Sequence, residues 1–283
     1  MTRIIHITDL HFWRIVRNPL SLLNKRFLGN LNLILRRQRY VHQERAQSFI
    51  DLFSTLKADA LLIGGDLTTT ATEAEYRMAT AFVNGLGQSG VPVYLTPGNH
   101  DFYTFESLRR KRFCAHFGER LEHPWKPRLT FLPGGTPLLI LPTARPNILS
   151  SRGHITMEQI SKAKELIEQA PAGRIIVLAH YPALSNPIHH ANIMRRLDNA
   201  APLRRMLGDT DRSFLYLAGH VHVFSHDCDP RFPKLEQVTS SALFYDKQNH
   251  KGGFTEIVFD DTMTKIQPWH YDDGWKPITV KNN

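Results

Sequence analysis

Short apolar runs that end in polar or turn-forming residues recur along this chain. They are Ile4–Thr8, Ala60–Ile63, Val93–Thr96, Leu138–Leu141, Ile175–Ala179 and Phe214–Ala218. Runs this short, with turn residues at their ends, are typical of strands in the interior of a protein. We therefore predict a buried strand at each of these runs.

Between these runs, apolar residues recur at the spacing of one helix face. This spacing predicts helices at Ala46–Leu56, Ala74–Leu86 and Ile160–Ile167. After about residue 235 the pattern changes to strands alone, at Phe254–Phe259 and Lys265–Trp269. Strands that alternate with helices, followed by strands that pair locally, predict an α/β protein built as a layered αββα sandwich.

Composition is consistent with one folded unit. The 283 residues are 42% hydrophobic and 22% charged, which is enough for a sizeable core. We see no repeat or linker, and we predict a single domain over residues 1–283. Two cysteines, Cys114 and Cys228, give no disulfide framework and fit a reducing, cytoplasmic compartment. No signal peptide is visible, and no run approaches the roughly 18 apolar residues of a membrane-spanning helix.

Side chains that can bind metal ions follow the predicted strands. They are Asp9, His11, Asp66, Asn99, His180, His220 and His222. Each alone has an ordinary explanation, such as a turn or a buried histidine, but together they follow successive strands, and open α/β sheets bind ligands at the carboxyl ends of their strands. Carboxylate, imidazole and amide groups suit Mn, Fe or Zn. Seven ligands exceed the needs of one tetrahedral ion and fit two divalent ions that share a carboxylate.

The motifs also carry a resemblance. The series Asp9-Leu10-His11, Gly65-Asp66, Gly98-Asn99-His100-Asp101, His180 and Gly219-His220-Val221-His222 resembles the calcineurin-like metallophosphoesterase superfamily. This resemblance implies the layered sandwich and a two-metal centre, with manganese as the first expectation. It implies that the first ion is bound by Asp9, His11, Asp66 and His222. It implies that the second is bound by Asp66, Asn99, His180 and His220, with Asp66 bridging the two.

The same resemblance implies a phosphoesterase reaction. A hydroxide held between the two ions attacks phosphorus in line, while the ions offset charge on the phosphate oxygens. His100 then steadies the transition state or protonates the leaving oxygen. Asp101 either orients His100 or caps the helix that follows, and we expect the orienting role.

A basic, apolar stretch follows the first strand. Residues 10–43 contain no Asp or Glu and carry seven Arg or Lys residues, of a net charge of +9 for the whole chain. One helical face there is apolar and is flanked by basic residues; the set is Leu20, Leu23, Lys25, Arg26, Phe27, Leu28, Leu31, Ile34, Arg36 and Arg37. Such a helix is typical of an interfacial membrane anchor. We therefore predict that residues 12–40 are an insert, of one helix or two, that faces a membrane and the substrate.

Two other readings of the insert stay open. Apolar residues at helical spacing often pack in a core, although Ala46–Leu56 already supplies a core helix here. Nucleic acid also binds basic surfaces, but this stretch has few aromatic side chains to stack on bases.

Further basic pairs follow two of the ligand motifs. They are Arg109-Arg110, which we expect within a helix, and Arg195-Arg196. Each pair either belongs to a solvated helix face or, because arginine matches phosphate geometry, contacts an additional phosphate of the substrate.

A two-metal esterase with a membrane-binding insert needs an amphiphilic phosphate substrate. Within the superfamily the chain resembles the UDP-2,3-diacylglucosamine pyrophosphatase branch of chlamydiae and their relatives. The commoner branch has Arg where this chain has His100. The resemblance implies hydrolysis to lipid X and UMP in lipid A synthesis, at the inner face of the cytoplasmic membrane. It implies no protein partner. The alternatives are a soluble cyclic-nucleotide phosphodiesterase, a DNA nuclease and a non-catalytic scaffold.

Overall fold

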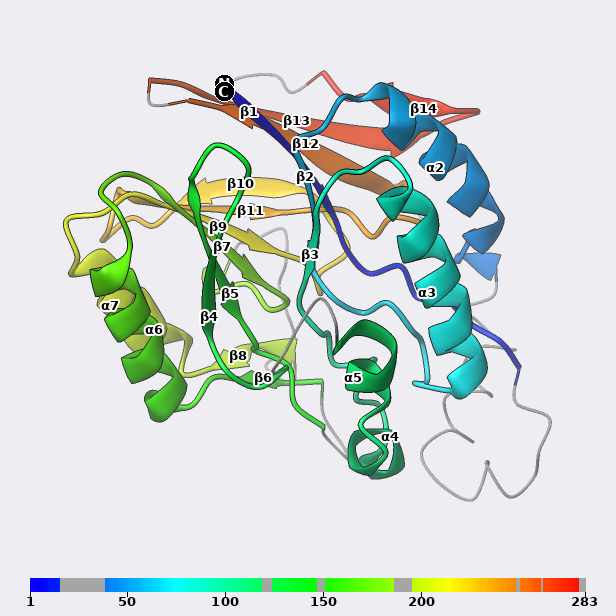
Figure 1. Ribbon diagram of the computed structural model, residues 1–283, viewed down its shortest axis with the longest axis horizontal. Helices are drawn as coiled ribbons and strands as arrows, with labels where there is room; N and C mark the ends of the chain where they lie inside the picture. The colour runs from blue at the N-terminus through cyan, green and yellow to red at the C-terminus, as the bar shows by residue number, and fades with distance from the viewer. Residues whose placement is uncertain are drawn as a thin grey trace.

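The computed structural model describes residues 1–15, 39–118, 124–146, 151–185, 195–247, 250–260 and 262–279. Every strand predicted from the apolar runs is present, with ends that agree to within two residues. The layered α/β architecture is therefore confirmed. Two six-stranded sheets form the centre of the molecule, and helices lie on their outer faces (Figure 1).

The first sheet contains the N-terminal strand. Its order is β14 (Trp275–Pro277), β13 (Thr264–Tyr271), β12 (Gly253–Phe259), β1 (Thr2–Ile7), β2 (Ala60–Ile63) and β3 (Val93–Leu95). Strands β1, β2 and β3 are parallel, whereas β12 is antiparallel to β1. The carboxyl ends of the three parallel strands therefore lie at one edge of this sheet.

The second sheet has the same design. Its order is β10 (Ser225–Cys228), β11 (Leu235–Thr239), β9 (Phe214–Ala218), β7 (Ile175–Ala179), β5 (Pro137–Leu141) and β4 (Arg128–Phe131). Strands β5, β7, β9 and β11 are parallel. A small third sheet pairs β6 (Gly153–His154) with β8 (Leu197–Asp198), near the carboxyl end of β5.

Helices cover both outer faces of the sandwich. Figure 1 shows α2 (Ala46–Thr55) and α3 (Glu73–Gly87) beside the first sheet, and α6 (Met157–Gln169) and α7 (Ala200–Gly208) beside the second. A short 3-10 turn at Gln43–Arg45 leads into α2. Thr72 caps α3 through a reciprocal capping box with Glu75, which satisfies amide groups that the helix start leaves unpaired. The predicted helices are thus present where the apolar spacing placed them.

The core follows the two-residue period of the strands. Ile176 and Leu178 of β7 pack between the two sheets, together with Ile4 of β1. Their neighbours in sequence, such as Val177 and Ile5, face the helices. Successive side chains of a strand point to opposite faces, so strands buried on both faces are apolar at every position. This is why they appear in the sequence as continuous apolar runs.

The basic segment after the third strand differs from the expectation of one helix. Helix α4 (Phe105–Arg109) ends there and α5 (Arg112–Phe117) begins three residues later. Lys111 between them has φ of 49°, a left-handed conformation that interrupts an α-helix. Arg112 then turns inward, where it donates to the carbonyl of Ala71 and pairs with Glu106.

Candidate metal centre

The seven predicted ligands all follow carboxyl ends of parallel strands. In the first sheet, Asp9 and His11 follow β1, Asp66 follows β2 and Asn99 follows β3; in the second, His180 follows β7 and His220 and His222 follow β9. Hydrogen bonds join the two edges: Nδ1 of His180 contacts the carbonyl of Gly64 at 2.7 Å, and the amide of His220 donates to Oδ2 of Asp9 at 2.8 Å. The sandwich therefore brings ligands from both sheets to one place.

Backbone conformation marks these positions as unusual. Asp9, His11, Asp66, His220 and His222 all have φ between 50° and 68°. Non-glycine residues in this left-handed region are strained by roughly 1–3 kcal/mol each and cluster at functional sites. Backbone hydrogen bonds hold them there, such as Asp9 N to Gly65 O and His11 N to Asp66 O, both 2.9 Å.

Two glycines allow the ligand loops to approach one another. A Cβ atom on Gly98 would lie 2.1 Å from Oδ1 of Asp66, and one on Gly219 would lie 1.9 Å from Oγ1 of Thr8. No side chain can be accommodated at such distances. The glycines in the Gly-Asn-His-Asp and Gly-His-Val-His motifs are thus explained by close packing between loops.

The first ligand group contains Asp9, His11 and His222. Nε2 of His222 lies 3.1 Å from Oδ1 of Asp9 and 3.1 Å from Nε2 of His11. The other oxygen of Asp9 accepts from the hydroxyl of Thr8, which fixes the carboxylate. Two imidazole nitrogens and a carboxylate oxygen thus converge on one point.

The second group contains Asp66, His180 and His220. Nε2 of His180 lies 3.4 Å from Oδ2 of Asp66 and 3.2 Å from Oδ1 of Asn99, so the amide of Asn99 belongs to this group. Because the carbonyl of Gly64 can only accept, Nδ1 of His180 carries a proton, so Nε2 is the ring atom that would bind an ion.

Asp66 lies between the two groups. Its Oδ2 is 3.9 Å from Nε2 of His11 and 3.4 Å from Nε2 of His180. Its Oδ1 accepts from the amide of His100 at 2.7 Å. This is the position that a carboxylate shared by two ions requires.

The electrostatics of the centre are those of a cation site. Burial opposes ionisation of Asp66, but the surrounding histidines, His180 foremost, hold the pKa of Asp66 well below its usual range. Burial likewise opposes the charged form of His180, and Asp66 outweighs it, which raises the pKa of His180 to about 9. Burial, aided by the charge of His180, lowers the pKa of His220 to about 3. A neutral imidazole beside carboxylates is the form that binds a metal ion.

An unsatisfied atom supports the same assignment. Nε2 of His220 is buried and makes no hydrogen bond within the described part of the chain. Buried polar atoms without a hydrogen-bond partner are rare, and an ion is one of the few reasons for them. The residues present therefore fit a dimetal site.

His100 lies at the edge of this centre. One of its ring nitrogens is within 4.8 Å of ligand atoms of His11 and Asp66. Its Nδ1 donates to the carbonyl of Thr69 at 2.6 Å, and its ring stacks on that of Tyr103. With Nδ1 engaged, Nε2 is the atom that can act on a ligand bound at the centre.

The structure gives Asp101 a different set of partners from the one expected. Its two oxygens accept from the amides of Leu67, Thr68 and Gly98, at 3.3, 3.0 and 2.9 Å, and from the hydroxyl of Thr68 at 3.0 Å. It is the carbonyl of Thr69 that holds the ring of His100. Asp101 therefore joins the loops after β2 and β3.

The two arginine pairs expected to contact a substrate phosphate lie in different parts of the structure. Arg109 and Arg110 are exposed, Arg110 pairs with Glu106 at 2.9 Å, and neither bonds to a metal-binding side chain among the described residues. Arg195 and Arg196 are also exposed but lie at the start of the small third sheet, where the carbonyl of Arg196 accepts from Gly153 N.

Sequence reasoning missed Tyr181. Its hydroxyl lies 2.9 Å from Oδ1 of Asn99, and its ring lies 4.1 Å from that of His220, centroid to centroid. Its place next to His180 in sequence was the available signal, but an aromatic residue after a buried strand is equally typical of core packing.

The residues predicted to bind a membrane, from Leu20 to Arg37, lie outside the described residues. The flanking ends are described. Phe12 is buried and packs against Phe82, while the carbonyl of Tyr40 accepts from Asp246 N. No helix in the described ranges is long and apolar enough to cross a bilayer.

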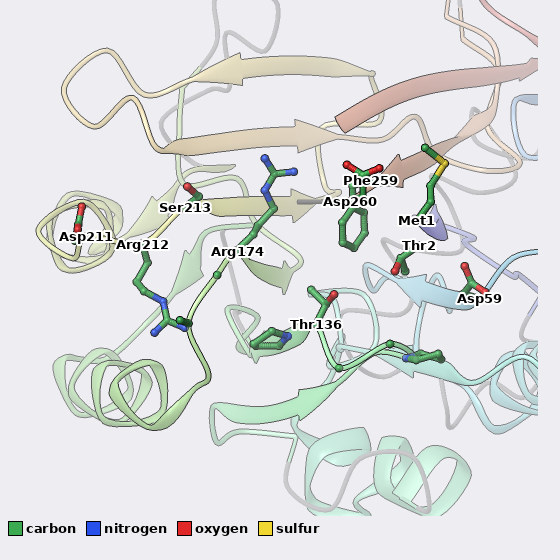
Figure 2. A pocket seen from close by; sticks show the side chains of 16 residues that line it. Met1, Thr2, Asp59, Thr136, Arg174, Asp211, Arg212, Ser213, Phe259 and Asp260 are labelled. Atoms are coloured by element: carbon green, nitrogen blue, oxygen red, sulfur yellow. The ribbon is translucent and has the colours of Figure 1, made fainter. Parts of the chain in front are cut away.

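A cleft of about 910 Å³ lies away from the ligands (Figure 2). Its lining includes Thr2 at the start of β1, Arg174 just before β7 and Ser213 just before β9. The metal ligands follow the opposite, carboxyl ends of these same strands. The cleft is therefore at the other end of the sandwich from the candidate centre.

Comparison with known proteins identifies the chemistry. A family model described as calcineurin-like phosphoesterase matches residues 2–224. No curated protein sequence matches the chain. Among solved structures, the chain is similar to a dimetal phosphatase from Danio rerio, with a TM-score of 0.65 and 13% identity over 98% of this chain and 95% of that one.

Two other solved structures have related folds. Purple acid phosphatase PPD1 from yellow lupin seeds has a TM-score of 0.58 and 14% identity, over 95% of this chain and 51% of that one. The protein TT1561 of Thermus thermophilus has a TM-score of 0.51 and 16% identity, over 94% of this chain and 97% of that one. Identities this low show the shared fold alone.

Proposed function

Because this chain belongs to the calcineurin-like phosphoesterase family and is a metal-dependent phosphoester hydrolase, we propose that its substrate is UDP-2,3-diacylglucosamine. The bond hydrolysed is the pyrophosphate bond, and the products are lipid X and UMP. The reaction takes place at the cytoplasmic face of a membrane, with manganese as the metal. The observation that carries the hydrolytic chemistry is the position of Asp66 between two histidine groups.

The protein's own groups have distinct parts in this reaction. Two divalent ions, when bound, activate water for attack and offset the charge of the phosphate. The carbonyl of Thr69 orients the ring of His100, so that Nε2 faces the centre and can give a proton to the leaving oxygen. Tyr181 fixes the amide of Asn99 through its hydroxyl, so the second group is arranged before substrate binds.

The lipid part of the proposal rests on the basic, apolar stretch after β1. Residues 10–43 hold seven Arg or Lys residues and no acid. The described end of this stretch reaches the centre. The ring of Tyr40 contacts that of Tyr245, whose ring centroid lies 5.0 Å from that of His222. A membrane-bound Leu20–Arg37 segment would deliver a lipid-linked substrate beside the first ligand group.

A soluble cyclic-nucleotide phosphodiesterase is the second candidate. The Gly-Asn-His-Asp and Gly-His-Val-His motifs fit it equally well. The deciding assay compares turnover of UDP-2,3-diacylglucosamine in detergent with turnover of cyclic AMP and of bis-p-nitrophenyl phosphate by manganese-loaded protein. Higher kcat/KM for cyclic AMP than for the lipid nucleotide would reject the proposed substrate.

The membrane segment has its own test. Leu23→Glu with Leu31→Glu removes apolar side chains that would each contribute roughly 1.5–3 kcal/mol if fully buried in the bilayer. We expect this variant to leave anionic liposomes in a flotation assay, and its turnover of the lipid nucleotide to fall relative to that of the soluble diester. The matched control, Lys25→Gln with Arg26→Gln, should lose less binding at physiological salt. An equal loss of both activities in the leucine variant would mean that the segment is part of the core.

A further inference from the structure

A cluster of arginines lies beside the second ligand group. Oδ2 of Asp198, in β8, accepts from Nη2 of Arg145 at 2.9 Å, and its Oδ1 accepts from Nε of Arg152 at 2.8 Å. One carboxylate is thus shared by two guanidinium groups that are each more than a third exposed. Arg195 and Arg196 precede the same strand. The cluster therefore has a surplus of positive charge.

The histidine beside Asp198 in this cluster, His154, carries no negative charge. Nδ1 of His154 lies 3.9 Å from Asp198. Burial, together with the charge of Arg145, lowers the pKa of His154, so its ring is neutral near pH 7. Among the described residues, Asp198 is the one acidic side chain in contact with Arg145.

Backbone contacts place this cluster next to the candidate centre. The hydroxyl of Thr143, two residues before Arg145, accepts from the amides of His180 and Tyr181. The hydroxyl of Tyr181 lies 2.7 Å from the carbonyl of Ser151, the residue before Arg152, and 2.9 Å from Asn99. Both arginines therefore extend from positions directly beside ligands of the second group.

Arg145 also has a donor to spare. Asp198 takes one N–H of Nη2. The side chain of Arg145 is 38% exposed, so a ligand can reach its remaining Nη–H groups, whereas its Nε is buried. Arginine presents its N–H groups in a planar fork that matches two oxygens of a phosphate. The guanidinium of Arg145 is only partly occupied by Asp198 and lies beside the candidate dimetal centre. It is therefore suited to bind the phosphate that is bonded to the phosphate being cleaved.

We propose that Arg145, held by Asp198, binds the second phosphate of a diphosphate substrate and so makes the enzyme select pyrophosphates over simple phosphodiesters. The phosphate to be cleaved lies on the two metal groups, and its neighbour lies on Arg145, with Arg152 and Arg195 at the rim. This subsite deepens the proposed function, because UDP-2,3-diacylglucosamine carries two adjacent phosphates. A purely structural Arg145 would instead only tie β8 to the loop after β5.

UDP and UMP separate these two roles, because they differ by one phosphate. Both are titrated into manganese-loaded protein by calorimetry and used as competitive inhibitors of bis-p-nitrophenyl phosphate hydrolysis. We expect UDP to bind more tightly than UMP to the parent protein. In Arg145→Ala, UDP affinity should fall roughly tenfold to a hundredfold, the loss expected for a hydrogen-bonded charged group, whereas UMP affinity should change less than about threefold.

Two further variants complete the test. Arg145→Lys retains the charge without the fork and should retain part of the UDP preference, and it serves also if Arg145→Ala does not fold. Arg77→Ala removes an exposed arginine that pairs with Glu73 on α3 and should change neither affinity. Equal losses for UDP and UMP, or no UDP preference in the parent protein, would overturn the subsite. The comparison needs no lipid substrate, so failure to cleave UDP-2,3-diacylglucosamine would reject the substrate while the subsite is still decided.

Discussion

Replacing Asp101 by Asn tests how the loop backbone supports catalysis. The carboxylate of Asp101 accepts from three amides and one hydroxyl, with both oxygens in use. The side-chain amide of Asn has only one acceptor oxygen. In its best orientation the NH₂ group replaces Oδ1, where it can donate to the hydroxyl of Thr68 but faces the amide of Thr68. At least one buried N–H is then left unsatisfied.

The magnitude follows from that count. A buried N–H without an acceptor costs about 1–3 kcal/mol. Burial and the nearby Asp66 raise the pKa of Asp101 to about 7, so its negative charge is itself unfavourable in the folded protein. Removal of this charge offsets part of the loss. We therefore expect a loss of about 1–3 kcal/mol in the free energy of unfolding, or a Tm lower by roughly 2–6 °C. Since the same loop positions Thr69, which orients His100, kcat should also fall, by roughly tenfold.

Three measurements check this reasoning: thermal unfolding, metal content by elemental analysis, and kcat with a poor leaving group. Asp229→Asn is the matched control, because Asp229 is also buried and accepts from Arg204 and from the amide of Arg231. It follows β10, which is antiparallel to β11, and therefore lies at the edge of the sheet opposite the ligands. It should lower stability while kcat stays at the parent value at temperatures where both are folded. An Asp101→Asn variant with lower Tm and unchanged kcat would refute the link to His100. A loss of metal would show that Asp101 acts on the ions instead.

Three other changes have clear expected outcomes. Asp66→Ala should lose both ions and nearly all activity, because Asp66 lies between the two groups; normal loading of two ions would contradict the shared carboxylate. His100→Ala should retain both ions but lose roughly 10²–10⁴-fold in kcat on an alkyl diester, and an unchanged kcat would rule out a role in proton transfer. Burial opposes ionisation of Asp229, but hydrogen bonds, that from Arg204 foremost, outweigh it and lower the pKa of the carboxyl. The contribution of this carboxylate to stability is therefore present above about pH 4 and is lost as pH falls through the lowered pKa. The Tm difference between parent and Asp229→Asn should therefore shrink as pH falls from about 4 to about 2, and a difference independent of pH would count against the pair.

The sequence determined the interior strands and the candidate ligands because both are local signals. Strands β2, β7 and β9 are buried on both faces, so each is a continuous apolar run that ends in a turn. The ligands follow those ends directly, as His180 follows Ala179. Each motif could therefore be found without knowledge of its distant neighbours.

The edge strands β4 and β10 gave no such signal. Strand β4 contains Arg128 and Thr130, and β10 contains His226 and Asp227, because one face of each is only partly covered. Neither has an apolar run of its own, so their place in the sheet depends on pairing with β5 and β11. The break at Lys111 was equally hidden, since basic residues on both sides are compatible with one helix.

Only the tertiary structure decided which side chains act on one another. The partners of Asp101 were open in the sequence, because the amides of Leu67 and Thr68 are more than thirty positions away. Arg145 and Arg152 belong to no motif, yet Asp198 of a different segment gathers them beside Tyr181. Ligand identity is thus set by residues next to strand ends, whereas selectivity among phosphates depends on contacts between segments that meet only when both sheets are packed together.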